Sequence, residues 1–71
     1  MTRSQILKLQ KIVDGQTYQE SLINEAINLA TSREVSHALK ALRGGFVSTE
    51  GRFLISEFIV ELLRSKQTTN K

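Results

Sequence analysis

The 71-residue chain contains no cysteine and no proline, and these two absences limit the folds that it can adopt. A chain this short buries only about 60% of the surface that its unfolded form exposes, so its core is marginal unless something adds burial. Without cysteine it has neither disulfides nor thiolate metal sites. The lack of proline favours uninterrupted helices. We therefore expect one small helical domain that gains further burial by forming an oligomer.

The first two apolar segments have boundaries that local chemistry predicts. Apolar residues recur at helical spacing over residues 4–13, and Asp14-Gly15 ends this segment because glycine accepts the left-handed backbone found after a helix. Thr17 and Glu20 then have the spacing of a capping box, in which a hydroxyl and a carboxylate satisfy amides at the start of a helix. We therefore expect one helix over residues 4–13 and a second helix capped by Thr17.

The third segment follows almost at once. Thr31 and Glu34 have the same capping-box spacing, and Gly44-Gly45 stops a helix that runs from about residue 33 to residue 43. Its inner stripe consists of Val35, Ala38, Leu39 and Leu42. The second and third helices should therefore meet at a tight corner near residues 30–31.

The predicted fold class is all-α, a compact bundle of about four short helices in which the second and third form a helix-turn-helix-like pair. Residues 1–66 make up the single helical domain, and residues 67–71 form a disordered polar tail.

Residues 46–55 leave two structures open. In one, Ser48 or Thr49 caps a last helix that starts near Glu50. In the other, this stretch forms a short β-hairpin, as in a winged helix, because Phe, Val and Ile favour strands and Glu-Gly favours a turn. We favour the helix, because an isolated hairpin of this length is poorly stable unless it is packed.

Few side chains could carry out catalysis. Ser36 and His37 are adjacent, so on a helix they point about 100° apart and cannot form a nucleophile–base pair. Glu57 and Glu61 lie four positions apart on the last helix. We interpret them as two solvated charges, which is simpler than an acid–base pair. His37 is the only imidazole, and no carboxylates cluster near it. We therefore expect no enzyme, no metal and no cofactor.

Nucleic-acid binding has more support, because the chain is basic and its charges are grouped. The formal net charge is +3 and the isoelectric point is about 9.7. On the third helix, polar and basic residues share the face opposite the inner stripe. We expect double-stranded DNA as the partner, with the major groove contacted by Arg33, Ser36, His37 and Lys40 and the phosphates contacted by Arg43, Arg52, Lys8 and Lys11.

Residues 32–55 also resemble known DNA-binding regulators. The run SREVSHALKAL followed by GFVSTEGRFLI is similar to the recognition helix and wing of the cyclic-nucleotide-responsive family of winged-helix transcription regulators. This resemblance implies that Arg33 and Glu34 contact bases and that Arg52 approaches phosphates from the wing. ALKALRGGFVSTEGR followed by SEFIVELL is similar to the helix-turn-helix at the C-terminal side of serine recombinases. Both resemblances imply a small transcription regulator or DNA-binding module.

The last apolar segment, residues 53–63, is wider than the stripe of about 100° that a core-facing helix needs. We expect its excess surface to form a homodimer interface made of Phe53, Ile55, Phe58, Ile59, Leu62 and Leu63. The alternative function is an adaptor or inhibitor that binds another protein through this helix, with the basic stripe facing an acidic partner. No apolar run reaches the roughly 20 residues that span a bilayer, so a cytoplasmic protein is expected.

Overall fold

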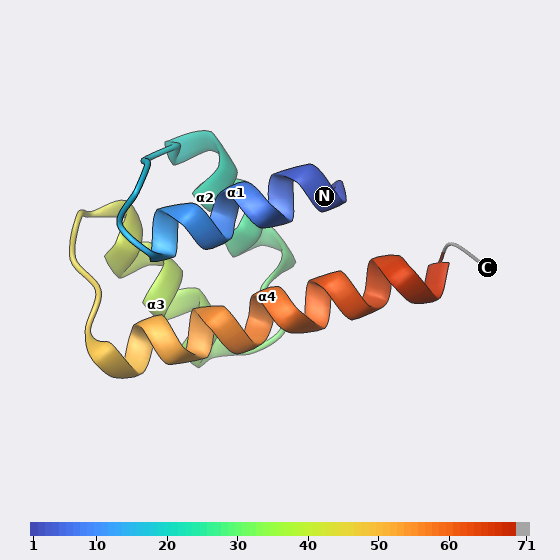
Figure 1. The fold of residues 1–71 in the computed structure, drawn as a ribbon. Coiled ribbons are helices and arrows are strands. Elements are labelled where there is room, and N and C mark those ends of the chain that lie inside the picture. Colours follow the sequence, from blue (N-terminus) through green and yellow to red (C-terminus); the bar gives the residue numbers. More distant parts are fainter. Residues whose placement is uncertain (70–71) are drawn as a thin grey trace.

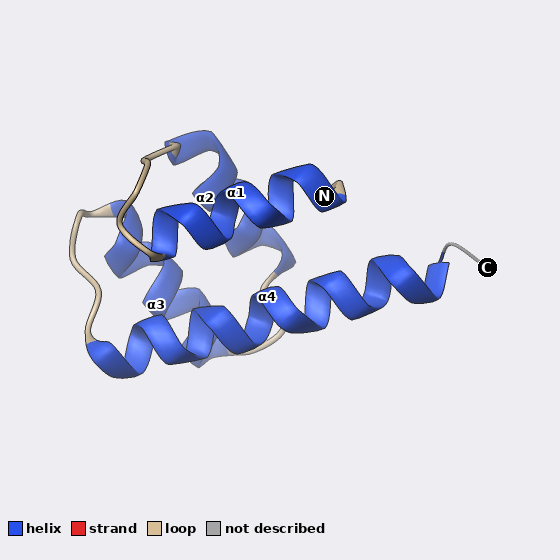
Figure 2. Cartoon of the chain, in the orientation of Figure 1, coloured by secondary structure: helices blue, strands red, loops and turns tan. Residues whose placement is uncertain are grey.

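The computed structural model describes the backbone of residues 1–69 and the side chains of residues 1–65. Its helices are α1 (Arg3–Val13), α2 (Glu20–Leu29), α3 (Arg33–Arg43) and α4 (Thr49–Thr69), as Figure 1 shows. No strand occurs among the described residues (Figure 2), so the all-α prediction is confirmed. The β-hairpin alternative for residues 46–55 is wrong, because α4 begins at Thr49. Residues 67–69, expected in a disordered tail, continue α4, and residues 70–71 lie outside the described part.

Helix α1 begins one residue earlier than expected because Thr2 caps it. The Thr2 hydroxyl accepts from the Gln5 amide at 3.2 Å, and the Gln5 side chain accepts from the Thr2 amide at 2.8 Å. These two bonds form a capping box with glutamine in place of glutamate. At the other end Gly15 has φ +79°, and its amide donates to the Ile12 carbonyl at 3.0 Å. The predicted stop at Asp14-Gly15 is confirmed.

Helix α2 begins later than the sequence suggests. Its N-cap is Gln19, which makes no side-chain cap hydrogen bond, so the capping box predicted at Thr17 and Glu20 is not formed. Residues 17–19 belong instead to the connection between α1 and α2, residues 14–19. In this connection the Tyr18 hydroxyl donates to the main-chain carbonyl of Arg43 at 2.7 Å. The contact with α3 holds this stretch outside the helix, and the predicted box has no helical turn to cap.

Helix α4 is capped by Ser48, one of the two capping residues considered for it. The Ser48 hydroxyl accepts from the Gly51 amide at 3.0 Å. Gly51 itself is buried in the first turn of α4, at the place where α4 approaches α3. A Cβ atom there would lie 3.1 Å from Val47 Cγ2 and 3.5 Å from Ala38 Cβ. The glycine therefore permits a close approach between α3 and α4, and it is not part of a hairpin turn.

The helices enclose one apolar core, to which each of them contributes. Its buried residues are Ile6, Leu9, Ile12, Val13, Leu22, Ile23, Ala26, Val35, Ala38, Leu39, Leu42, Ile55, Phe58 and Ile59. The inner stripe predicted for α3 is confirmed in full. Among the described residues, no polar or charged side chain is buried. Apolar packing is therefore what stabilises this bundle, as expected for a chain without disulfides.

The order of packing decides which surfaces lie together. Helix α4 packs against both α1 and α3, α2 packs against α3, and α1 and α2 share a smaller contact. Helices α1 and α3 therefore occupy opposite corners of the bundle, and their outer faces point in different directions. In Figure 1, α4 is the longest helix, and its C-terminal turns extend beyond the ends of the other three.

Candidate nucleic-acid interface

Helix α3 is fixed at both ends by local hydrogen bonds. The Ser32 hydroxyl accepts from the Val35 amide at 3.2 Å, so the cap lies one residue after the predicted Thr31. At the C-terminal end the Gly45 amide donates to the Leu42 carbonyl at 3.0 Å and the Phe46 amide to the Ala41 carbonyl at 2.9 Å. This is the Schellman arrangement, and it uses φ +87° at Gly45. The ends of α3 are therefore well defined.

The outer face of α3 carries the predicted basic stripe. Arg33, His37 and Lys40 are all exposed, and their spacing of four and three residues puts them within about 60° of the helix circumference. Among the side chains that the structure describes, no carboxylate forms an ion pair with any of the three. Ser36 is only half-exposed, at the edge of the stripe. The stripe can therefore offer its cationic groups to an anionic partner without first breaking an internal pair.

Arg43 differs from the rest of the predicted set because it is already bound at both its side chain and its main chain. One guanidinium nitrogen donates to Asn24 Oδ1 of α2 at 2.7 Å. Its carbonyl accepts the hydrogen bond from Tyr18. Arg43 therefore ties α3 to α2 and to the α1–α2 connection, and its guanidinium still has further N–H groups that can face solvent.

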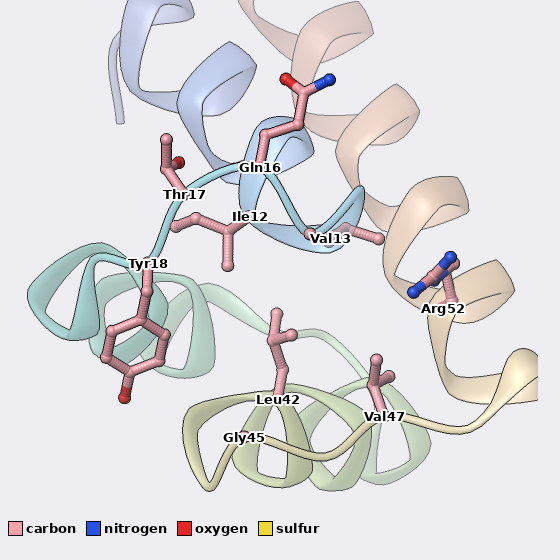
Figure 3. Close-up of a pocket in the computed structure, with 10 residues that line it drawn as sticks. Ile12, Val13, Gln16, Thr17, Tyr18, Leu42, Gly45, Val47 and Arg52 are labelled. Carbon is pink, nitrogen blue, oxygen red and sulfur yellow. The ribbon is translucent and has the colours of Figure 1, made fainter.

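Arg52 does not join the α3 stripe. It lies on α4 and lines a cleft of about 480 Å³ together with Val13, Leu42, Val47 and other residues (Figure 3). The expectation that Arg52 approaches phosphates from a wing is therefore corrected, because residues 46–55 form no wing.

Lys8 and Lys11 are exposed on the outer face of α1. Because α1 and α3 occupy opposite corners of the bundle, these two lysines do not extend the α3 stripe. Arg3 and the exposed Leu7 lie beside them on α1 and line an open depression of about 750 Å³ with them. The eight predicted DNA contacts are therefore distributed over three surfaces, and only the α3 stripe gathers several of them.

The predicted dimer interface is only partly at the surface. Ile55, Phe58 and Ile59 are 0%, 3% and 2% exposed because α1 and α3 pack over this side of α4. These three residues belong to the core, and their assignment to an interface is corrected. Leu62 and Leu63 are half-buried at the edge of the core, and Phe53 is 65% exposed.

Sequence reasoning missed three features of these surfaces. Val60 is 46% exposed and lies on the same outer side of α4 as Phe53. Asn24 binds Arg43, and Tyr18 binds the end of α3. The position of Val60 could have been found by extending the helical period from Phe53. The Asn24–Arg43 hydrogen bond spans 19 positions of the sequence and the Tyr18–Arg43 hydrogen bond spans 25. No local sequence pattern predicts contacts over such separations.

A metal site and a membrane-spanning helix were also looked for among the described residues. Within the described part of the chain, no three His, Cys, Asp or Glu side chains come together in a way that could hold a metal ion. No helix there has the length and apolar character needed to cross a membrane. Comparison of the chain with protein families, with curated proteins and with solved structures found no match in any of the three.

Proposed function

We propose that this protein is a small, non-catalytic regulator that binds double-stranded DNA through the outer face of α3. The observation that carries the proposal is the exposed stripe of Arg33, His37 and Lys40, which pairs with no carboxylate among the described side chains. Arginine and lysine donate to phosphate oxygens and to guanine edges, and histidine can contact either. A face with these side chains matches the chemistry of a duplex groove.

The arrangement of α2 and α3 supports the same proposal. Only residues 30–32 separate the two helices, which pack closely together. In helix-turn-helix proteins a short turn of this kind holds the second helix so that its N-terminal half can enter the major groove. Arg33 stands at the first position of α3, where such contacts are made. An α-helix fits the major groove, which is about 12 Å wide.

Two copies of the chain would present two such helices to a two-fold related site. We propose that the copies associate through the outer side of α4, where Phe53, Glu57, Val60 and Arg64 follow one another at helical spacing. Burial of the exposed apolar side chains Phe53 and Val60 between two copies favours a second copy as the partner of this side.

The test is fluorescence anisotropy of a labelled mixed-sequence duplex, titrated with protein at about 50 and 200 mM salt. Several phosphate contacts predict a loss of affinity by orders of magnitude across that range. The double variant Arg33→Ala/Lys40→Ala should abolish binding and keep the helical circular dichroism spectrum. Its matched control is Lys8→Ala/Lys11→Ala, which removes the same charge from α1 and should weaken binding less than about threefold, by long-range attraction alone.

Two results would overturn the assignment. If the Lys8/Lys11 variant loses binding and the Arg33/Lys40 variant keeps it, the interface lies on α1. If the folded wild-type protein binds no duplex at low salt, DNA is not its partner. In that case the second candidate is an adaptor that holds an acidic protein. The 65% exposure of Phe53 favours that alternative, and Phe53→Ala would then be the damaging change.

A further inference from the structure

The cleft in Figure 3 lies at the end of the bundle where three segments of the chain converge. Its sides are the α1–α2 connection, the turn after α3, and the first turns of α4. Its apolar floor consists of Ile12, Val13, Leu42 and Val47. The volume of about 480 Å³ falls within the range of roughly 300–1,000 Å³ that small-molecule sites occupy. The cleft can therefore admit a compact organic molecule.

Its polar groups are few and are placed at the edges. Among the described residues, Arg52 is the single charged one that lines the cleft. It is exposed, and within the described side chains no carboxylate pairs with it. Tyr18 stands on the opposite side of the cleft from Arg52, as Figure 3 shows. A molecule lying across the floor would thus have a cation at one end and an aromatic ring at the other.

The walls of the cleft are held in place before any ligand binds. The turn after α1 and the turn after α3 are each closed by a pair of hydrogen bonds that return to the preceding helix. The hydrogen bond from Tyr18 to the Arg43 carbonyl then joins the two walls. A preorganised site loses little conformational freedom on binding, and more of the contact energy contributes to affinity.

We infer that this cleft binds a small apolar anion, with its carboxylate, sulfonate or phosphate group on Arg52 and its apolar body over Val13, Leu42 and Val47. The guanidinium supplies charge-assisted hydrogen bonds to the anionic group. The floor removes the apolar body from water. The inference does not depend on DNA binding, because none of these residues belongs to the α3 stripe.

A matched pair of fluorescent probes tests both halves of the site. Anilinonaphthalene sulfonate has an apolar body and an anionic group, and phenylnaphthylamine has a closely similar body without the charge. We expect saturable, blue-shifted emission from the sulfonate and binding of the neutral probe weaker by about tenfold, the effect of losing one charge-assisted hydrogen bond. Amide chemical shifts should locate the sulfonate, with changes concentrated at residues 15–18 and 45–47.

Variants separate Arg52 from general positive charge. Arg52→Gln should weaken the sulfonate by about tenfold and leave the neutral probe unchanged, while Arg52→Lys should restore part of the loss. Arg33→Gln, which removes an arginine from α3, should change neither. Circular dichroism checks that each variant is folded. Equal affinity for the two probes, an unchanged affinity in Arg52→Gln, or shift changes centred on Leu7 and Lys11 of α1 would each overturn the inference.

Discussion

The phenol of Tyr18 donates a hydrogen bond of 2.7 Å to the main-chain carbonyl of Arg43, across a separation of 25 residues. That carbonyl lies in the last turn of α3, where a helix lacks its own donors. The guanidinium of the same arginine donates to Asn24 at 2.7 Å. Through Arg43, the end of α3 is thus attached both to α2 and to the α1–α2 connection, and these two contacts add to the core packing that holds α3 in place.

Removal of the Tyr18 hydroxyl should lower the stability of the fold without changing its shape. We expect Tyr18→Phe to reduce the free energy of unfolding by about 0.5–1 kcal/mol, the net contribution of one neutral hydrogen bond. Urea denaturation followed by circular dichroism measures the change. Thr17→Val is the control, because it removes a neighbouring exposed hydroxyl that caps nothing. Equal unfolding midpoints for the two variants would contradict a stabilising role for the Tyr18 contact.

The two glycines after α3 should respond in opposite ways to alanine. Gly45 has φ +87°, so Gly45→Ala should cost about 1–2 kcal/mol although no atom lies within 4 Å of the new Cβ. Gly44 has φ −79°, and its Cβ would meet only the Ala41 carbonyl oxygen at 3.5 Å. Gly44→Ala should therefore be neutral or stabilise by up to about 1 kcal/mol, because it restricts the unfolded chain.

Thermal or urea unfolding of this neighbouring pair isolates the effect of backbone conformation from that of side-chain space. Both variants add the same methyl group to the same turn. If Gly44→Ala were the more damaging of the two, the left-handed backbone at Gly45 and the Schellman closure of α3 would be incorrect.

The parts of the fold that the sequence predicted are those decided by neighbouring residues. The stops at Asp14-Gly15 and Gly44-Gly45 require a residue with a left-handed backbone conformation directly after a helix, and a glycine in the sequence predicts it. Caps were less certain because several hydroxyls precede each helix. Thr31 and Ser32 are both suitable, and only the backbone of the turn decides that Ser32 caps. Thr17 has the spacing of a cap, but the Tyr18 contact with α3 keeps the helix from starting there.

The buried side of α4 could not be predicted, because it depends on helices distant in the sequence. Residues 53–63 are apolar on more than one side, and α1 and α3 decide that Ile55, Phe58 and Ile59 face inward. The basic stripe of α3 was predicted as a set because all its members lie on one helix. Arg52, Lys8 and Lys11 lie on other helices, and their separation from the stripe follows from the packing order of the bundle.

Replacement of Gly51 by a large residue should lower the stability of the fold more than replacement by a small one. A Cβ at this position lies 3.1 Å from Val47 Cγ2 and 3.3 Å from the Ser48 hydroxyl. Gly51→Ala gains about 1 kcal/mol of helix propensity, which offsets this tight contact, so its stability should be close to wild type. Gly51→Leu must push α3 and α4 apart and should cost about 1–3 kcal/mol. Equal stability of the two variants would contradict the close approach of α3 and α4.

Two neighbouring residues of α4 provide the sharpest test of its two sides. Ile59 is 2% exposed and Val60 is 46% exposed. Ile59→Asp places a carboxylate in the core at a cost of several kcal/mol, a large share of the roughly 5–15 kcal/mol that stabilises a small domain. We expect this variant to be unfolded by circular dichroism. Val60→Asp adds the same group on the outer side, and it should stay folded.

Light scattering after size exclusion, over a range of protein concentrations, then reports on the association of α4 with a second copy. If the stripe from Phe53 to Arg64 joins two copies, the wild type should be a dimer and Val60→Asp a folded monomer, because the carboxylate would lie in the seam between two helices. Val60→Thr, which keeps the size of the side chain, should weaken the dimer less. A wild-type protein that stays monomeric at all concentrations would contradict the proposed dimer. A dimeric Val60→Asp variant would show that the two copies meet through another face. A folded Ile59→Asp would contradict the core itself.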